Sequence, residues 1–290
     1  MKHLINYDSP AALKSFLHER GFSMQKRFGQ NFLVNPSARI NLINRLNVEK
    51  GDEVWEIGAG LGAMTALLLE RGARVRAFEV DRGFCAVLKE LFADEAGFVL
   101  VEGDVLETWT EERARSAAAP LLLGNLPYNI GARVLGGFIE GGFFFRRILV
   151  TVQREVARRI AAKPADKDYS SLSALASRHY HTKLLSVLKG ASFFPAPRVE
   201  SQAVLLELKE GSADGEDPAE FASVVRALFS SRRKTVKNNL AAFLKAPACD
   251  AAAALQACGI APDERAERLT PDDFARLTLF CSSGLPGGRP

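Results

Sequence analysis

The sequence predicts an α/β protein with a Rossmann-like sheet and a smaller all-helical C-terminal domain, and three observations support this fold class. From residue 53, short apolar runs alternate with segments of helical periodicity, which is typical of a parallel sheet covered by helices. The first apolar run leads into a glycine-rich turn at 58–63 that opens a helix. Beyond the polar stretch 211–218 the pattern is helical only.

Apolar runs define the expected strands. Five of them are predicted to be parallel strands, at 54–57, 74–78, 98–101, 121–124 and 147–152. Helices are expected between the first three, over 61–70 and 82–92. Two further runs, 184–189 and 203–208, are close in the chain and suggest an antiparallel edge to the sheet.

Breaks in the pattern delimit the remaining parts. Ser9 and Pro10 open a helix that runs to Arg20, and Gly21 ends it. Further helices are expected after Asn35-Pro36 and over 219–230, 235–244, 251–258 and 271–281. We therefore expect an N-terminal extension at 1–24, a sheet domain at 25–210, and a helical domain at 211–290 with a mobile tail from residue 284.

Composition argues against several classes of protein. Apolar residues make up 47% of the chain, enough for a large core. The four cysteines are far apart and form no CxxC pair, so neither a disulfide framework nor a metal site is expected. Residues 1–10 lack the apolar core of a signal peptide, and no apolar run approaches the roughly 20 residues of a membrane span. We expect a cytoplasmic protein. The net charge of +4 decides little about its partners.

Three features at successive strand ends predict a site for an adenosine. The turn at 58–63 fits the G-x-G-x-x-G/A fingerprint, in which Gly58 and Gly60 let a ligand approach backbone N–H groups. Glu79 ends the second strand, where a carboxylate accepts both hydroxyls of a ribose. Asp104 follows the third strand and is placed to accept from an adenine amino group. These features are equally compatible with NAD and with S-adenosylmethionine.

The tetrapeptide Asn125-Leu126-Pro127-Tyr128 follows the fourth predicted strand and distinguishes the two cofactors. An adenine amino nitrogen is a weak nucleophile because its lone pair is delocalised into the ring. The Asn125 amide oxygen and the Leu126 carbonyl are expected to hold both amine hydrogens, and preorganised contacts of this kind contribute roughly 2.7–4 kcal/mol each. Pro127 fixes the backbone, and Tyr128 offers a ring on which the base stacks. The pattern indicates methyl transfer from S-adenosylmethionine to adenine.

Five segments together resemble the ribosomal RNA adenine dimethyltransferases, which modify two adjacent adenines near the 3′ end of small-subunit (16S) RNA. The segments are 26–33, 56–62, 125–128, 193–201 and 232–240. The resemblance extends over nearly the whole chain from about residue 25. It implies a methyltransferase sheet, S-adenosylmethionine as the cofactor, and a role in the biogenesis of the small subunit.

The resemblance also implies roles for individual residues in cofactor binding. Asn31, Leu33 and Gly58 are expected at the methionine end of the donor. Glu79 is expected at the ribose and Asp104 at the donor adenine.

A second group of residues is implied to act on the target adenine. Asn125 is expected to hold the amine, next to the donor, and Tyr128 and Phe193 to stack on the two faces of the base. Ala59 stands where the family usually has proline, which we expect to alter the stiffness of the loop rather than the chemistry.

Basic residues in two places are expected to contact RNA phosphates. Lys26 and Arg27 lie beside the predicted site, and a denser cluster opens a helix of the C-terminal domain, at Arg232, Arg233, Lys234 and Lys237. The expected partner is small-subunit RNA in the immature 30S particle, bound by a monomer.

Three other functions remain open from the sequence. A large-subunit RNA methyltransferase of the antibiotic-resistance type has the same fold, but segment 232–240 favours the small-subunit enzyme. A nicotinamide dehydrogenase leaves segment 125–128 unexplained, and no Tyr-x-x-x-Lys pair is placed for hydride chemistry. A non-enzymatic assembly factor is compatible with the first function, since one protein can both bind the particle and methylate it.

Overall fold

The structure is a computed structural model, and it describes residues 5–22, 31–116, 119–127, 130–211 and 215–283. The predicted tail from residue 284, the basic residues Lys26 and Arg27, and Tyr128 lie outside the described residues. Seven strands form the main sheet: β2 (Glu53–Ile57), β3 (Arg74–Glu79), β4 (Phe98–Glu102), β5 (Leu121–Asn125), β6 (Arg147–Gln153), β7 (Tyr180–Leu188) and β9 (Ser201–Leu208).

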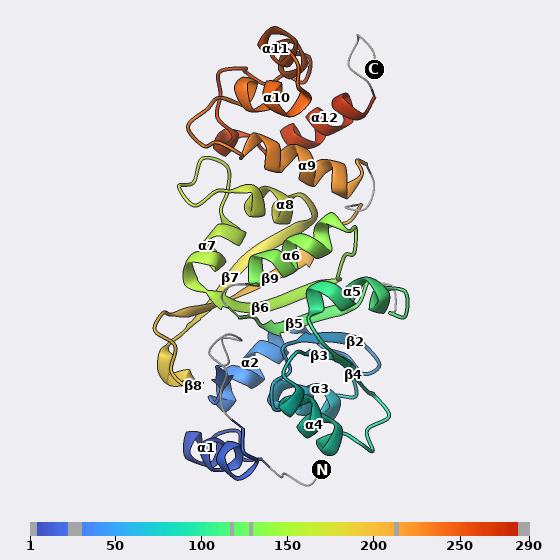
Figure 1. The fold of residues 1–290 in the computed structure, drawn as a ribbon, viewed down its shortest axis with the longest axis vertical. Coiled ribbons are helices and arrows are strands. Elements are labelled where there is room, and N and C mark those ends of the chain that lie inside the picture. Colours follow the sequence, from blue (N-terminus) through green and yellow to red (C-terminus); the bar gives the residue numbers. More distant parts are fainter. Residues whose placement is uncertain (1–4, 23–30, 117–118, 128–129, 212–214, 284–290) are drawn as a thin grey trace. The chain divides into compact units, whose positions relative to one another are not determined.

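The order of the strands in the main sheet, which Figure 1 shows, contains one reversal of direction. The order is β4-β3-β2-β5-β6-β9-β7, and the pairs between β4 and β6 are parallel. The chain moves outward from β2 to β4 and then returns to β5 on the other side of β2. Ligands of such sheets bind at the carboxyl ends of the strands where this reversal occurs. Ile57 pairs with Gly124 there, so the glycine-rich turn and Asn125 lie side by side.

The predicted α/β class with an antiparallel edge is confirmed, although its elements differ in detail. Strand β9 pairs antiparallel with β6. Strand β7 begins four residues before the predicted run, because α8 (Ser171–His179) passes into it without a loop. Four helices were not predicted: α5 (Val105–Arg113), α6 (Gly131–Glu140), α7 (Arg154–Ala161) and α8. Three glycines in α6 lower its intrinsic helix propensity, so sequence periodicity alone gave a weak signal there.

A second sheet of two short strands was also not predicted. β1 (Phe32–Leu33) pairs antiparallel with β8 (Phe193–Phe194), and Leu33 lies opposite Phe193. Two residues are too few to show the period-2 alternation by which a strand is recognised. The pairing joins two segments that are distant in the sequence and that both carry predicted site residues.

Helices cover the sheet, and their caps follow the sequence signals. Asn35 caps α2 (Pro36–Leu46) by accepting from the Ala38 N–H at 2.9 Å. Helices α3 (Ala63–Glu70) and α4 (Arg82–Leu91) follow β2 and β3. One apolar cluster joins α2, α3, α4 and the sheet strands; it includes Leu33, Ile43, Leu68, Leu88, Leu123 and Phe193.

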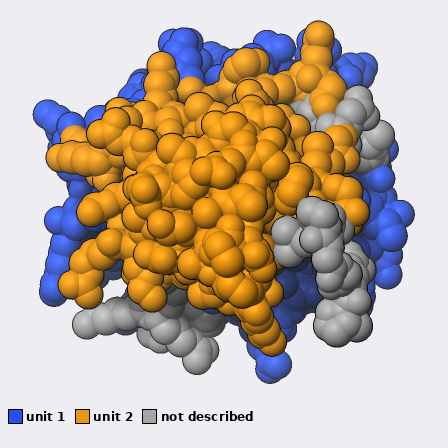
Figure 2. Space-filling view, turned by 90° about the horizontal axis from the view of Figure 1, so that it is seen from above, with its two compact units in different colours: residues 1–134, 145–157, 183–207 blue, residues 135–144, 158–182, 208–290 orange. Residues whose placement is uncertain are grey.

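The chain forms two compact units, which Figure 2 colours blue and orange. The first comprises residues 1–134, 145–157 and 183–207 and carries the glycine-rich turn. The second comprises residues 135–144, 158–182 and 208–290. Its C-terminal part contains α9 (Pro218–Leu228), α10 (Val236–Leu244), α11 (Ala248–Ala257) and α12 (Pro271–Ser282), without a strand among the described residues. The domain boundaries expected from the sequence stay a prediction.

The described residues contain no helix long and apolar enough to cross a membrane. Within the same residues there is no group of three or more histidine, cysteine, aspartate or glutamate side chains arranged to hold a metal ion. Two histidines that are close in the sequence lie apart from one another: His179 ends α8 and packs on Phe144 at 4.5 Å between ring centroids, whereas His181 is exposed on β7.

Candidate active site

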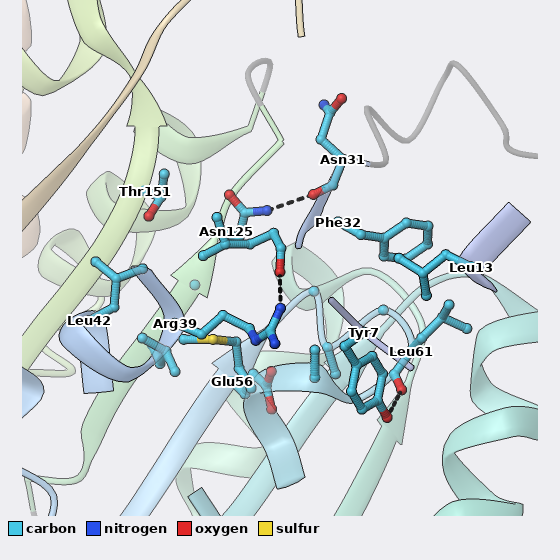
Figure 3. A pocket seen from close by; sticks show the side chains of 18 residues that line it. Tyr7, Leu13, Asn31, Phe32, Arg39, Leu42, Glu56, Leu61, Asn125 and Thr151 are labelled. Atoms are coloured by element: carbon cyan, nitrogen blue, oxygen red, sulfur yellow. Dashed lines mark hydrogen bonds between the residues drawn. The ribbon is translucent and has the colours of Figure 1, made fainter. Parts of the chain in front are cut away.

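A pocket opens at the carboxyl ends of β2 and β5 (Figure 3). It brings together five sequence-predicted site residues, Asn31, Leu33, Gly58, Gly60 and Asn125. Its wall includes the strand residues Leu123, Gly124 and Thr151. The pocket therefore combines three of the segments on which the family resemblance depends.

The glycine-rich turn takes a conformation that favours glycine. Gly58, Gly60 and Gly62 have φ values of +75°, +58° and +85°, a region that side chains disfavour. The Gly58 N–H donates to the Phe78 carbonyl at 2.9 Å, which holds the turn against β3. Gly62 is the N-cap of α3. The turn therefore presents backbone to the pocket, as the fingerprint predicts.

Glu79 fastens the same turn from the end of β3. Its carboxylate accepts the Gly60 N–H at 2.7 Å and the N–H groups of Val80 and Asp81 at 2.9 Å each. The side chain is 6% exposed, and burial raises its pKa. A carboxylate offers about four acceptor positions, so the three backbone donors leave room for about one more. Glu79 is behind the turn rather than in the lining of the pocket.

Asn125 is held at the end of β5 by one hydrogen bond. Its Nδ2 donates to the Asn31 carbonyl at 2.8 Å (Figure 3). This bond fixes the orientation of the amide, because a carbonyl accepts only from the NH₂ side. No described residue donates to the amide oxygen, which is thereby left as an acceptor. Leu126 follows, 2% exposed, with its N–H donating to the Thr151 carbonyl at 3.0 Å.

Among the described residues, Leu126, Asp104 and Phe193 are outside the lining of this pocket. Asp104 caps α5, accepting the Leu106 N–H at 2.9 Å. Phe193 is 4% exposed and belongs to the main apolar cluster, because side chains alternate along β8 and its neighbour Phe194 is the half-buried one. Tyr128, the expected partner of Phe193, is outside the described residues.

Besides Thr151, three polar residues of the pocket were not predicted as site residues. Tyr7, Arg39 and Glu56 lie together in Figure 3, and all three line the pocket. Glu56 belongs to the glycine motif but was read only as a strand residue; it is 3% exposed and accepts a hydrogen bond from Thr65 Oγ1 at 2.6 Å. A buried carboxyl group that lines a pocket is a functional candidate. Sequence spacing gives no comparable signal for Tyr7 or Arg39.

Glu56 gives a prediction for the pH dependence of stability. Burial raises its pKa from 4.5 to about 8. Between these values the unfolded chain has released the proton and the folded chain keeps it, so a rise in pH favours unfolding. We expect the melting temperature of the ligand-free protein to fall relative to that of Glu56→Gln from about pH 5 to about pH 8. Thermal denaturation across that range tests this, with the exposed Glu70→Gln as control; parallel curves for all three proteins would contradict it.

The basic cluster of the second unit is partly neutralised by its own unit. Arg232 Nε donates to Glu267 at 2.8 Å, and Lys237 Nζ to Asp263 at 3.0 Å. Arg233 and Lys234 are exposed, and no carboxylate among the described residues pairs with them. The four predicted phosphate contacts therefore differ in available charge.

Comparison with known proteins identifies the family. The family model described as ribosomal RNA adenine dimethylase matches residues 21–282. The chain belongs to this family. The chain is 44% identical over 277 residues to the Ribosomal RNA small subunit methyltransferase A of Treponema denticola, covering 94% of both chains.

Solved structures agree with the dimethylase fold. A dimethyladenosine transferase from Plasmodium falciparum superposes with a TM-score of 0.71 at 24% identity, covering 87% of this chain and 98% of that one. The 23S rRNA methyltransferase ErmE superposes with a TM-score of 0.60 at 19% identity, covering 86% of this chain and 99% of that one. At these identities the likeness shows the fold. As a ribosomal RNA adenine dimethylase, the chain is an S-adenosylmethionine-dependent enzyme, and the pocket is the expected place for that donor.

Proposed function

We propose that this enzyme transfers methyl groups from S-adenosylmethionine to N6 of two adjacent adenines near the 3′ end of small-subunit ribosomal RNA. The observation that carries the proposal is the fixed amide of Asn125 beside the glycine-rich turn. It places a hydrogen-bond acceptor for the target amine next to the backbone that the donor approaches. The relative from Treponema denticola is named for the small subunit.

One group of residues binds the methyl donor, and another binds the target adenine. The donor supplies an activated methyl group, so the protein's task is alignment of the reacting atoms. The turn at 58–62 gives backbone donors, and the remaining acceptor position of Glu79 takes a ribose hydroxyl. Asp104 faces the donor adenine with the carboxylate that also caps α5.

The target amine is held by residues that follow strand β5. The Asn125 amide oxygen and the Leu126 carbonyl accept its two hydrogens, which favours a pyramidal nitrogen with its lone pair directed at the methyl group. As the N–C bond forms, the S–CH₃ bond of the donor would break with its electron pair left on sulfur, and positive charge would develop on the amine. Each acceptor stabilises that charge, so the contacts strengthen toward the transition state and raise the rate. The surplus amine proton would then be lost to water. Tyr128 stacks on the base, whereas the Phe193 ring, expected from the sequence to cover its other face, is buried in the apolar cluster.

A direct test offers the purified enzyme both immature ribosomal subunits with labelled donor. We expect label in the small-subunit RNA, recovered as dimethyladenosine in a fragment from its 3′ end. Label confined to the large subunit would instead establish methylation of large-subunit RNA, the antibiotic-resistance type of activity. The 23S rRNA methyltransferase ErmE has a similar fold. Tight NAD binding without binding of S-adenosylmethionine would establish a dehydrogenase.

The basic cluster gives a prediction about RNA affinity. Arg233→Gln with Lys234→Gln removes the two unpaired charges, whereas Arg232→Gln with Lys237→Gln removes charges already paired with Glu267 and Asp263. The first double variant should lower the salt slope of log K by about 1.4–1.8, since each phosphate contact contributes about 0.7–0.9. The second should lower it less. RNA binding measured across a salt series decides between them, and equal slopes for both variants and the wild type would remove the cluster from the RNA interface.

Three narrower expectations complete the proposal. The enzyme acts as a monomer in the cytoplasm, its substrate is the immature 30S particle, and residues Lys26 and Arg27 contact RNA phosphates near the target. Sedimentation of the protein with and without the particle measures the first of these points.

A further inference from the structure

The N-terminal segment 5–22 packs directly against the donor pocket. Its helix α1 (Pro10–Glu19) begins with Ser9 as N-cap and buries Leu13 and Leu17. These side chains share an apolar cluster with Leu61 of the glycine-rich turn and with residues of α4; the cluster contains Ile5, Leu13, Leu17, Val34, Leu61, Phe84 and Val87. Leu13 and Tyr7 of the segment are themselves part of the pocket lining.

Arg39 links this segment to a predicted donor contact. Its guanidinium is 5% exposed, donates through Nη1 to the Leu33 carbonyl at 2.7 Å, and forms an ion pair with Asp8 through Nη2. One side chain therefore fixes both the backbone of β1 beside the pocket and the N-terminal segment. Such a planar fork holds two partners in a defined geometry.

Tyr7 makes the second link, to the glycine-rich turn. Its hydroxyl donates to the Leu61 carbonyl at 2.8 Å (Figure 3). Its ring lies among Arg39 and Glu56, so an aromatic hydroxyl, a cation and a carboxyl group gather in one part of the pocket. An amino acid carries a carboxylate and an ammonium group. The Arg39 cation matches the carboxylate by charge, and the Glu56 carboxyl group and the Tyr7 hydroxyl can accept hydrogen bonds from the ammonium group.

We propose that the N-terminal segment is a structural wall of the donor pocket, in which Tyr7 and the Asp8–Arg39 pair act as positioning residues for the amino-acid end of S-adenosylmethionine. The inference deepens the proposed function and rests on it. It differs from the sequence expectation, in which residues 1–24 were an extension outside the catalytic domain. Tyr7 holds the Leu61 backbone directly, and Asp8 acts on the Leu33 backbone through Arg39; both leucines line the pocket.

The test uses two ligands that differ only at the amino-acid end. S-adenosylhomocysteine carries that end, and 5′-methylthioadenosine lacks it. Arg39→Met removes both contacts, so the Leu33 carbonyl loses this donor and Asp8 loses its ion pair; since the Asp8 side chain is 56% exposed, no buried charge is stranded. Tyr7→Phe removes one hydroxyl. Arg20→Met is the matched control, because it breaks the ion pair of the same segment with Glu90, away from the pocket.

Calorimetry of the ligand-free full-length proteins gives the readout. We expect Arg39→Met to weaken the binding of S-adenosylhomocysteine by about 10-fold or more, and Tyr7→Phe to weaken it by about 2- to 10-fold. The affinity for 5′-methylthioadenosine should change by less than about 2-fold in either variant. Arg20→Met should bind both ligands as the wild type does. Equal weakening of both ligands, or no weakening of either, in variants whose circular dichroism is native would overturn the inference. A wild-type protein that binds neither ligand would instead contradict the proposed function.

Discussion

Replacing Asn125 with alanine is expected to lower the rate constant of methyl transfer by about 10²- to 10³-fold, the range found when one preorganised hydrogen-bonding group is removed from an active site. The amide lies at the end of β5 with Nδ2 bonded to the Asn31 carbonyl at 2.8 Å. Alanine leaves that carbonyl without its donor and removes the acceptor for the amine. The Leu126 carbonyl remains, so residual activity is expected.

Single-turnover methylation of small-subunit RNA measures this step, and the affinity of the variant for the immature particle is measured in parallel. Binding should be retained, because the basic residues that contact phosphate are unchanged. Asn41→Ala, an exposed asparagine on α2, is the control for loss of an amide. Methylation at the wild-type rate by Asn125→Ala would refute the catalytic role. Loss of methylation with retained binding would also show that assembly and catalysis are separate functions of the chain.

Much of the fold followed from the sequence because its signals are local. A strand with a continuous apolar run, a capped helix and a glycine-rich turn can each be recognised within a few residues, as for the cap Asn35 and the turn at 58–62. Elements whose stability depends on the rest of the protein gave no such signal. The two-residue strands β1 and β8 exist because they pair with each other across 160 residues of chain, and α6 forms despite three glycines.

Some site residues could likewise be predicted from local motifs, and others could not. Asn125, Gly58 and Gly60 could be predicted because a motif fixes their places at strand ends. Tyr7 and Arg39 could not, because only tertiary packing brings an N-terminal segment and a face of α2 to the pocket.

Other residues were predicted by type but have additional partners in the structure. Arg232 and Lys237 count as free charges in a sequence, whereas the fold pairs each with a carboxylate. Asp104 and Glu79 were expected as ligand acceptors, and in the structure both also accept backbone N–H groups that hold α5 and the glycine turn. A residue at a strand end therefore serves the fold and the ligand together.

Two glycines of the turn are expected to respond differently to substitution by alanine: one variant mainly loses affinity for the donor, and the other mainly loses stability. Gly58 and Gly62 both have left-handed φ values, +75° and +85°, so alanine introduces about 1–2 kcal/mol of backbone strain at either position. No described atom lies within 4 Å of a Cβ at Gly58, whereas a Cβ at Gly62 meets the Phe92 ring at 2.7 Å. Gly62→Ala therefore adds an overpacking penalty of about 1–3 kcal/mol.

The two glycine substitutions are also expected to differ in their effect on donor affinity. Gly58 lines the donor pocket, and the space beside it is where the donor approaches the backbone, so a methyl group there competes with the donor. We expect Gly58→Ala to lose about 10- to 100-fold in affinity for S-adenosylhomocysteine, equivalent to about 1.4–2.7 kcal/mol, with only the strain lost from its stability. Gly62→Ala should lose more stability in urea denaturation and, while folded, bind the donor analogue nearly as the wild type does. If both variants bound the analogue normally and lost equal stability, the turn would be a structural connection between β2 and α3 alone, and the donor would have to lie elsewhere.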